Sequence, residues 1–362
     1  MKNSLIYILC VCICVLAFCA CSQSEQTSGS PLAESESFSA DANSDSSDKA
    51  AMTDISIDFS EPESFSEPET SIPPKYGESS RKSIVVLGDS IARGYGLKNI
   101  EKERFSSLLA ESLKADYGKV SVQNYGVDGM TGRELAELLK ERRIKELSKC
   151  DTVIISIGGN NILQHITDGE TLSGMITDFD PVALIDYFRY LKTENPEEKS
   201  KLSYAVDAVD VLIDSIIAAF EGDAFAKLIE TAGHDLRKEI PEIIGEIRKV
   251  NKTADIYIQT VYNPFKGVVV ELEDITETPI DLGIYGENAV SALNTPILEL
   301  ADEYGYTAVE VHSLFEEYET GLTNAVFDLL TLNLSFDPHP NLRGHLLIAD
   351  LYYKIMSEDN DD

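Results

Sequence analysis

The stretch Ser83-Ile84-Val85-Val86-Leu87-Gly88-Asp89-Ser90 decides the fold of this chain. Its apolar, largely β-branched run predicts a buried strand, because such side chains pack well on a pleated surface. The run stops at Gly88, a small residue that allows a sharp turn and leaves Ser90 at the carboxyl end of the strand. Ligands of open α/β sheets bind at that end. Ser90 is therefore a candidate nucleophile, although an isolated Gly-Asp-Ser is more often an ordinary turn.

The same pattern of a short apolar strand followed by an amphipathic helix continues along the chain. Strands that alternate with helices indicate a parallel sheet covered on both faces, with right-handed crossovers. Pro241 is expected to interrupt or restart the helix that contains it. Further strands are predicted at 120–125, 151–157, 254–261 and 306–311, and helices at 103–113, 133–147, 181–191, 201–220, 225–250, about 283–304 and 342–356.

The composition excludes some classes of function. The chain has 362 residues, enough for one large or two modest domains, and its formal net charge is -33. Phosphate binding needs clustered Lys and Arg, so nucleic acid is not an expected partner. Electrostatic adhesion to anionic lipid is disfavoured for the same reason.

The N-terminus has the features of a targeting segment rather than of a folded domain. Lys2 precedes an apolar core at 5–18, which is too short for a comfortable membrane span. The Phe-Cys-Ala-Cys that ends it resembles a bacterial lipobox, which implies cleavage before Cys21 and lipid attachment to its thiol. Cys19 is a weaker alternative, and an ordinary secretory signal or an uncleaved anchor stays open. Residues 22–80 are rich in Ser, Glu, Asp and Pro and are predicted to form a disordered tether.

The folded body is predicted to span residues 81–358 and to contain one cysteine. Five of the six cysteines lie in the targeting segment, so only Cys150 remains and no internal disulfide framework is possible. We expect Cys150 to be a small packed residue.

Residue types needed for ester hydrolysis follow several of the strands. Ser90, Gly126 and Asn160 come at the ends of the first three, and His339 lies in a loop after the fifth. Because all these ends meet at one edge of a parallel sheet, the segments can converge. Ester hydrolysis needs a nucleophile, a base, a group that orients the base, and donors for the oxyanion. A G-x-S-x-G elbow is missing, which disfavours the usual α/β-hydrolase fold.

Four blocks in this order resemble the GDSL, or SGNH, hydrolase family, over Ser83 to about Met356. The resemblance implies a three-layer α/β/α fold with a five-stranded, mostly parallel, flavodoxin-like sheet and a helical insertion at about 162–222. The blocks that carry it are Gly88-Asp89-Ser90, the Gly126 of Asn124-Tyr125-Gly126, Gly158-Gly159-Asn160, and His339-Pro340-Asn341 followed by Gly344.

The resemblance also implies a role for each residue. Ser90 would be the nucleophile and His339 the general base, and the oxyanion would be bound by the N–H groups of Ser90 and Gly126 and by the Asn160 amide. The family usually has its acid three residues before the histidine, where Phe336 stands here. We favour Asp337, two residues before, because Pro338 can reshape the loop; a backbone carbonyl or another carboxylate is the alternative.

A second departure is Asn161, where the family usually has Asp; it is expected to support loop geometry. Asp89 is interpreted as structural. His345 is expected to be packed or on the surface. His165, His234 and His312 have no carboxylate or cysteine at ligand spacing in the sequence, so no metal and no other cofactor is expected.

The helical insertion has two interpretations. It either adds helices that cover the core, or it forms a cap over the site, with Phe179, Phe188, Ile213 or Ile217 shaping an acyl pocket. The loop 265–284 could form another wall. The sequence does not rank these interpretations.

Taken together, the sequence predicts a serine esterase or lipase on the outer face of a bacterial membrane, held there only by its lipid, or else secreted. Its substrate would be a small-molecule or glycan-borne ester. The alternatives are a catalytically weak glycan-binding lipoprotein and an O-acyltransferase on the same fold. The sequence leaves the oligomeric state open.

Overall fold

The computed structural model describes residues 74–141, 144–168, 181–270, 280–318, 321–324, 326–328, 333–335 and 337–358. The predicted signal segment, Cys21 and most of the predicted tether lie outside these residues. The end of the tether differs from the prediction, because residues 74–80 contact the folded body. The Lys75 and Tyr76 N–H groups donate to the carbonyls of Ala115 and Asp116, and the Tyr76 and Tyr117 ring centroids lie 4.9 Å apart.

The centre of the molecule is one five-stranded sheet in the order β2-β1-β3-β4-β7. Every neighbouring pair is parallel, and the order is that of a flavodoxin-like fold. This confirms the fold class predicted from the sequence. The strands are β1 (Arg81–Gly88), β2 (Lys119–Gly126), β3 (Thr152–Ser156), β4 (Asp255–Gln259) and β7 (Thr307–Val309).

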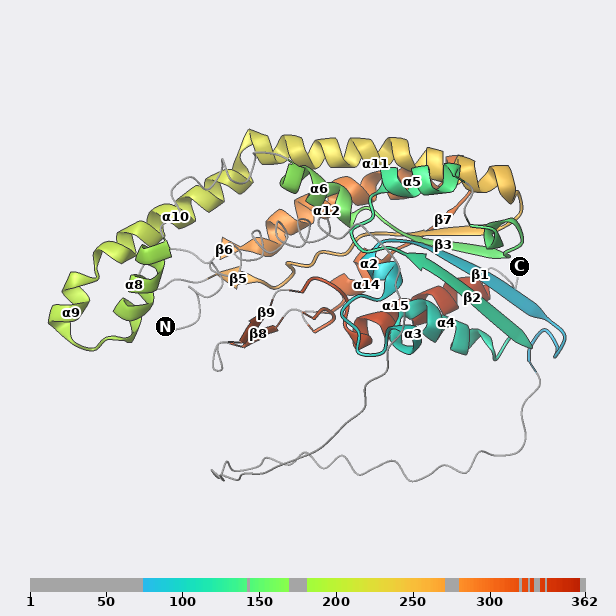
Figure 1. Cartoon of the computed structure of the whole chain (residues 1–362), viewed down its shortest axis with the longest axis horizontal. Coiled ribbons are helices and arrows are strands. Elements are labelled where there is room, and N and C mark those ends of the chain that lie inside the picture. The colour runs from blue at the N-terminus through green and yellow to red at the C-terminus, as the bar shows by residue number, and fades with distance from the viewer. Residues whose placement is uncertain are drawn as a thin grey trace, which may run out of the picture.

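Helices cover both faces of this sheet (Figure 1). Side chains that alternate along β1 face opposite layers: Val85 and Leu87 pack in one apolar cluster, and Ile84 and Val86 in the other. One layer contains α5 (Gly132–Lys140), α11 (Asp223–Val250) and α12 (Leu282–Glu299); the other contains α4 (Phe105–Leu113), α14 (Val311–Glu316) and α15 (Leu342–Glu358).

Shorter elements complete the body. Three short helices and a 3₁₀ turn are α2 (Ser90–Arg93), α3 (Ile100–Glu103), α13 (Ala301–Tyr304) and η1 (Glu146–Ser148). Two small antiparallel ladders pair β5 (Val269–Val270) with β6 (Ile280–Asp281) and β8 (Val326–Asp328) with β9 (Asn333–Ser335).

Two predicted helices differ from the structure. The segment 133–147 is helical only as far as Lys140 and resumes as the 3₁₀ turn. Conversely, α11 runs unbroken through Pro241. Proline removes one helical hydrogen bond, yet Ile240, Ile243 and Ile244 around it are all buried in the core. The packing of this apolar face on the sheet therefore sustains the helix where local propensity predicted a break.

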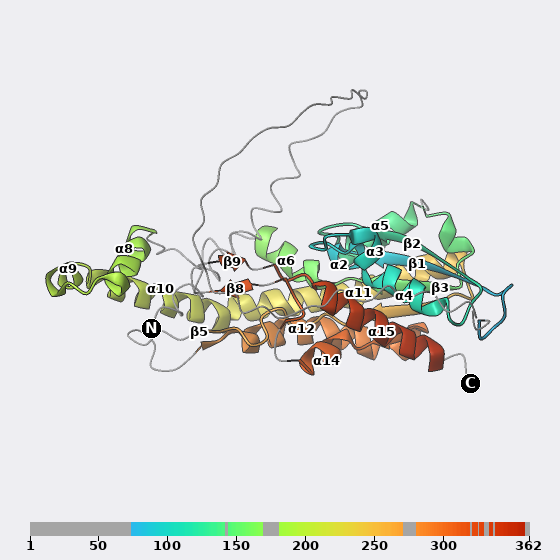
Figure 2. The same ribbon diagram turned by 90° about the horizontal axis from the view of Figure 1, so that it is seen from below.

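The helical insertion has two parts. α6 (Gly159–Asp168) packs on the core, where its Ile162 is buried, and α8 (Pro181–Lys192), α9 (Pro196–Lys201) and α10 (Tyr204–Glu221) form an arm. Figure 1 and Figure 2 both show α8, α9 and α10 reaching beyond the sheet, away from α2. These three helices therefore extend past the end of the sheet, whereas α6 covers part of the core.

Residues named for the predicted acyl pocket lie within this arm or outside the described residues. Ile213 is buried on α10, with Val209 of the same helix, while Asp207, Asp210 and Asp214 are exposed on the opposite face, as the amphipathic pattern predicted. The side chains of Phe179 and Phe188 are outside the described part. No helix among the described residues combines the length and the apolar character needed to cross a bilayer.

Cys150 is packed as expected. Only 4% of its surface is exposed, and burial raises the pKa of its thiol to about 11. The thiol is therefore protonated and unreactive at neutral pH.

Candidate active site

Ser90 is presented by a turn that only glycine can make. Gly88 ends β1 with φ +132°, and a Cβ at this position would lie 1.8 Å from the Ser156 carbonyl oxygen on the neighbouring strand. The chain then enters α2, which Asp89 caps: its Oδ1 accepts the Ile91 N–H at 2.9 Å. Ser90 is thus the first residue of a helix that begins at the carboxyl edge of the sheet.

A continuous line of hydrogen bonds runs from Asp337 through His339 to Ser90. His339 Nε2 lies 2.8 Å from Ser90 Oγ, and His339 Nδ1 lies 2.5 Å from Asp337 Oδ1. The structure therefore brings together the three residues that the sequence predicted as nucleophile, base and acid. Ser90 and His339 are 249 positions apart in the chain.

The two-residue offset between Asp337 and His339 is accommodated by a local turn. Asp337 Oδ1 accepts the backbone N–H of His339 at 3.0 Å as well as the ring nitrogen. An aspartate that bonds the backbone two residues on is an Asx turn. The turn is held from outside, since Tyr262 Oη donates to the Pro338 carbonyl at 2.6 Å and the Asn324 N–H donates to the His339 carbonyl at 2.9 Å.

The electrostatics of this line favour a proton on His339 Nδ1. Burial acts to raise the pKa of Asp337, but the hydrogen bonds from the His339 ring and backbone outweigh it and hold that pKa below its ordinary value. The carboxylate is therefore ionised at neutral pH. An anion beside Nδ1 stabilises the tautomer with the proton there and leaves Nε2 free to accept the Ser90 hydroxyl proton.

The three predicted oxyanion donors lie along the same edge of the sheet, but not all are free. Strand register aligns Gly88 with Gly126 on one side and with Ser156 on the other. A Cβ at Gly126 would lie 2.4 Å from Arg93 N on α2, so close packing excludes a side chain there. The Gly126 N–H donates to Asn124 Oδ1 at 2.9 Å and is thus engaged in the present structure.

The Ser90 N–H and the Asn160 side-chain amide each have a hydrogen available for an oxyanion. Ser90 N–H belongs to the first turn of α2, where backbone N–H groups have no intrahelical acceptor. Asn160 Nδ2 donates to the Met130 carbonyl at 3.2 Å. That bond uses one of its two hydrogens and leaves the other for an oxyanion.

Asp89 lies at the end of a buried polar chain behind Ser90. Ser156 Oγ contacts Asp89 Oδ1 at 3.5 Å, Gln259 Nε2 donates to Ser156 Oγ at 2.9 Å, and Tyr352 Oη donates to Gln259 Oε1 at 3.3 Å. Burial raises the pKa of Asp89 to about 6, against the lowering effect of the Ile91 N–H. Its contacts are those of a residue that shapes the turn.

Tyr95 and Asn324 are site residues that the sequence reasoning missed. The Tyr95 ring lies 4.5 Å from the His339 ring, between centroids, and is 44% exposed. Gly94 and Gly96 on either side of it have φ of +92° and +84°, so the Gly-Tyr-Gly sequence was the available signal. Asn324 could not be found in this way, because only the fold places it beside Asp337.

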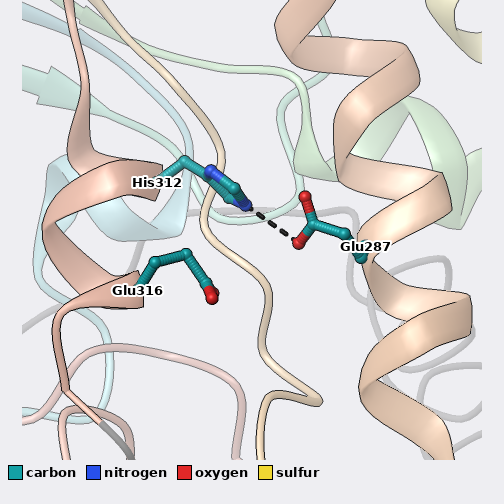
Figure 3. A group of neighbouring side chains, drawn as sticks. All are labelled: Glu287, His312 and Glu316. Atoms are coloured by element: carbon teal, nitrogen blue, oxygen red, sulfur yellow. Dashed lines mark hydrogen bonds and ion pairs between the residues drawn. The ribbon is translucent and has the colours of Figure 1, made fainter.

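The fold gives His312 carboxylate neighbours that we did not expect from the sequence. His312 Nε2 lies 3.0 Å from Glu287 Oε2, and Glu316 is on the same face of α14 (Figure 3). Their ligand atoms all lie within 4.8 Å of one another. The ammonium of Lys266 pairs with Glu316 at 3.0 Å and also contacts the end of α14. A lysine thus already supplies a positive charge to this cluster.

The other histidines are scattered. His345 is fully buried, and its Nδ1 accepts the Phe105 N–H at 3.2 Å, so it is a packed residue as one of the two expectations had it. His234 is exposed on α11, next to the buried Gly233 of the same helix. The side chain of His165 is outside the described part of the chain.

Comparison with known proteins gives one family. Residues 86–347 match the model of the GDSL-like Lipase/Acylhydrolase family. Among curated proteins, the chain is similar to the uncharacterized protein YpmR of Bacillus subtilis (strain 168), with 23% identity over 279 residues, which are 76% of this chain and 82% of the relative.

Solved structures to which this chain is similar include a lipase and a phospholipase. The lipase Lip_vut3 from a goat rumen metagenome is 16% identical, with 75% of this chain and 96% of that chain covered and a TM-score of 0.47. Phospholipase A1 from Streptomyces albidoflavus NA297 is 14% identical, with 76% and 98% covered and a TM-score of 0.44.

Proposed function

The chain belongs to the GDSL-like lipase/acylhydrolase family, and on that premise we propose that it is a serine ester hydrolase that uses Ser90, His339 and Asp337. The observation that carries this proposal is the unbroken line from Asp337 Oδ1 through the His339 ring to Ser90 Oγ, at 2.5 and 2.8 Å. A serine hydroxyl is a weak nucleophile until a positioned base takes its proton, and this geometry supplies the base.

In the proposed reaction, Ser90 Oγ attacks the ester carbonyl carbon while its proton moves to His339 Nε2. The carbonyl oxygen becomes an anion that accepts hydrogen bonds from Ser90 N–H and Asn160 Nδ2. Removing one such donor typically costs about 3 kcal/mol of transition-state stabilisation. Gly126 N–H can join only by sharing or exchanging its bond to Asn124 Oδ1. His339 then protonates the leaving alcohol.

The second half of the reaction repeats these roles with water. His339 Nε2 takes a proton from the water, whose oxygen attacks the acyl carbon, and the proton returns to Ser90 Oγ as the acid leaves. The ionised Asp337 stabilises the imidazolium that forms in each half.

We propose esters of lipids or of glycans as substrates, namely lysophospholipids, short-chain lipid esters or O-acetyl groups. We also propose that a lipid on Cys21 tethers the enzyme to the outer face of a bacterial membrane. The support is the lipobox-like sequence ending at Cys21 and the long polar segment after it. Loss of membrane association in Cys21→Ala, with wild-type protein in the membrane fraction, tests the anchor. Equal fractionation of the two would contradict it.

A fluorophosphonate probe tests the enzymatic proposal directly. We expect wild-type protein and Ser112→Ala, which lacks an exposed serine on α4, to be labelled, and Ser90→Ala to remain unlabelled. Failure of the wild-type protein to react would favour the glycan-binding alternative. Rates on a chain-length series of p-nitrophenyl esters, a lysophospholipid and acetylated xylan then identify the substrate class, and products formed with a sugar acceptor distinguish acyl transfer.

A further inference from the structure

Glu239 is a buried carboxylate that has no role in the proposed reaction but lies close to the predicted oxyanion donors. Glu239 is on α11, it is 8% exposed, and its Oε2 accepts a hydrogen bond from Asn161 Nδ2 at 2.7 Å. Asn161 is 4% exposed and directly follows Asn160, the predicted oxyanion donor. Glu239 thus contacts the chain neighbour of a predicted oxyanion donor.

This contact fixes which way the Asn161 amide points. With Nδ2 held by the carboxylate, Oδ1 faces the Gly132 N–H and accepts it at 3.1 Å. The adjacent Asn160 holds the Met130 carbonyl at 3.2 Å. Two consecutive asparagines therefore hold residues 127–132, the segment that begins immediately after Gly126, by hydrogen bonds to its backbone.

The fit around the carboxylate is tight. A Cβ at Gly132 would lie 2.3 Å from Glu239 Oε2, so glycine at the start of α5 is required for the carboxylate to reach Asn161. The charged groups that face Glu239 are Arg133 from α5, with 4.0 Å between Nε and Oε1, and Asp235 and Glu242 from its own helix. Because burial makes an unpaired carboxylate costly, the Asn161 amide is a partner that the site needs.

We propose that Glu239 is a positioning residue for the oxyanion hole, acting through Asn161 to set the loop 127–132 and the Asn160 amide relative to Ser90. This inference rests on the proposed function. Its physical basis is that donors stabilise an oxyanion only when held in place before the charge develops. Glu239, which would hold these donors, comes from α11, the helix that follows the arm, and not from the loops that carry Ser90 and His339.

Steady-state kinetics on a p-nitrophenyl ester test this role. Glu239→Ala leaves the Asn161 amide without its acceptor and free to rotate. Because a misplacement of about 1 Å can cost about a hundredfold in rate, we expect kcat to fall by about ten- to a hundredfold, with KM changed by less than about twofold. Glu239→Gln should restore most of kcat, because its Oε1 can still accept from Asn161. The matched control is Glu242→Ala, which breaks the 2.8 Å Lys140–Glu242 pair between α5 and α11 and should leave kcat unchanged.

Exchanging the amide of Asn161 with the carboxylate of Glu239 gives a second, independent test. Asn161→Asp puts two carboxylates in hydrogen-bond contact, which only a shared proton can relieve. We expect it to lose kcat at pH 8 and to recover as the pH is lowered. In Asn161→Asp/Glu239→Gln the new amide donates to the new carboxylate, so kcat should be restored at pH 8. The ratio of kcat in the double variant to that in the single variant should fall towards one at lower pH.

The outcomes separate this inference from the proposed function. An active wild-type protein in which Glu239→Ala keeps its full kcat overturns the inference alone, as does an equal loss in Glu242→Ala. A double variant no faster than Asn161→Asp at any pH also overturns it, and this comparison decides the matter if Glu239→Ala does not fold. Wild-type protein that neither hydrolyses esters nor reacts with the fluorophosphonate overturns the proposed function, and the inference with it.

Discussion

Replacing Asp337 by asparagine removes the charge beside His339 while keeping the size and an acceptor oxygen. In Asp337→Asn, the side-chain carbonyl oxygen can still accept the backbone N–H of His339 that closes the turn, a bond that Asp337 Oδ1 makes at 3.0 Å in the wild-type protein. The substitution therefore isolates the electrostatic role of the carboxylate from its role in loop geometry.

The magnitude follows from the separation of the charges. Asp337 Oδ1 is 2.5 Å from His339 Nδ1, so the centres of the carboxylate and of a protonated imidazole lie about 4 Å apart. At an effective dielectric constant of about 20, that pair is worth about 4 kcal/mol. Because the imidazolium exists only during reaction, the loss falls on kcat, by about a thousandfold.

The assay is steady-state hydrolysis of a p-nitrophenyl ester, with protein folding verified by thermal unfolding. Asp350→Asn is the matched control, because it removes an exposed carboxylate that pairs with Lys354 on α15, away from His339. A kcat for Asp337→Asn within about threefold of the wild-type value would refute the assignment of Asp337 as the group that orients His339.

Two further predictions concern the loops around Ser90. The pKa of Asp89 in the folded protein is about 6, above the ordinary 3.8, so between these values the native state binds more protons than the unfolded state. The free energy of unfolding should therefore fall as the pH rises from about 4 to about 6, by at most about 3 kcal/mol. Urea unfolding at pH 4 to 7 should show a smaller fall for Asp89→Asn. Free energies of unfolding that fall equally with pH in the wild-type protein and the variant would show that Asp89 is not the cause. At Gly96, φ is +84° and a Cβ would lie 2.4 Å from Asn324 Nδ2 and 3.0 Å from Asp337 Oδ2, so Gly96→Ala should lower both kcat and Tm. Gly77→Ala, at φ +92° with nothing within 4 Å, should cost only the backbone strain of about 1–2 kcal/mol and leave kcat unchanged; equal effects of the two on kcat would refute the steric argument.

Local sequence patterns were sufficient for the sheet, and together with the family resemblance they indicated the candidate catalytic residues. The apolar runs that end at Gly88, Gly126 and Gly158 predicted strands whose carboxyl ends meet, and the structure places them side by side in the order expected of this family. Periodicity and chain order carry this information because strands and helices form from neighbouring residues, and parallel strands share one edge.

Boundaries that depend on packing were less accurate. Local propensity predicted a break in α11 at Pro241, yet the burial of that helix on the sheet overrides it. Residues 74–80 were assigned to the tether because their composition is polar, whereas hydrogen bonds to the turn that follows α4 incorporate them into the body.

The sequence by itself determined the parallel sheet, the position of Ser90 after its first strand, and His339 as the partner from the last loop. The tertiary structure alone decided that Asp337 reaches the imidazole from two residues away and that Gly126 N–H is engaged by Asn124. It also decided that Glu239 holds Asn161 and that α8 to α10 extend as an arm. The first set depends on spacings within a few residues. The second depends on which side chains meet across tens to hundreds of residues, and those meetings are fixed by strand register and helix packing rather than by any local pattern.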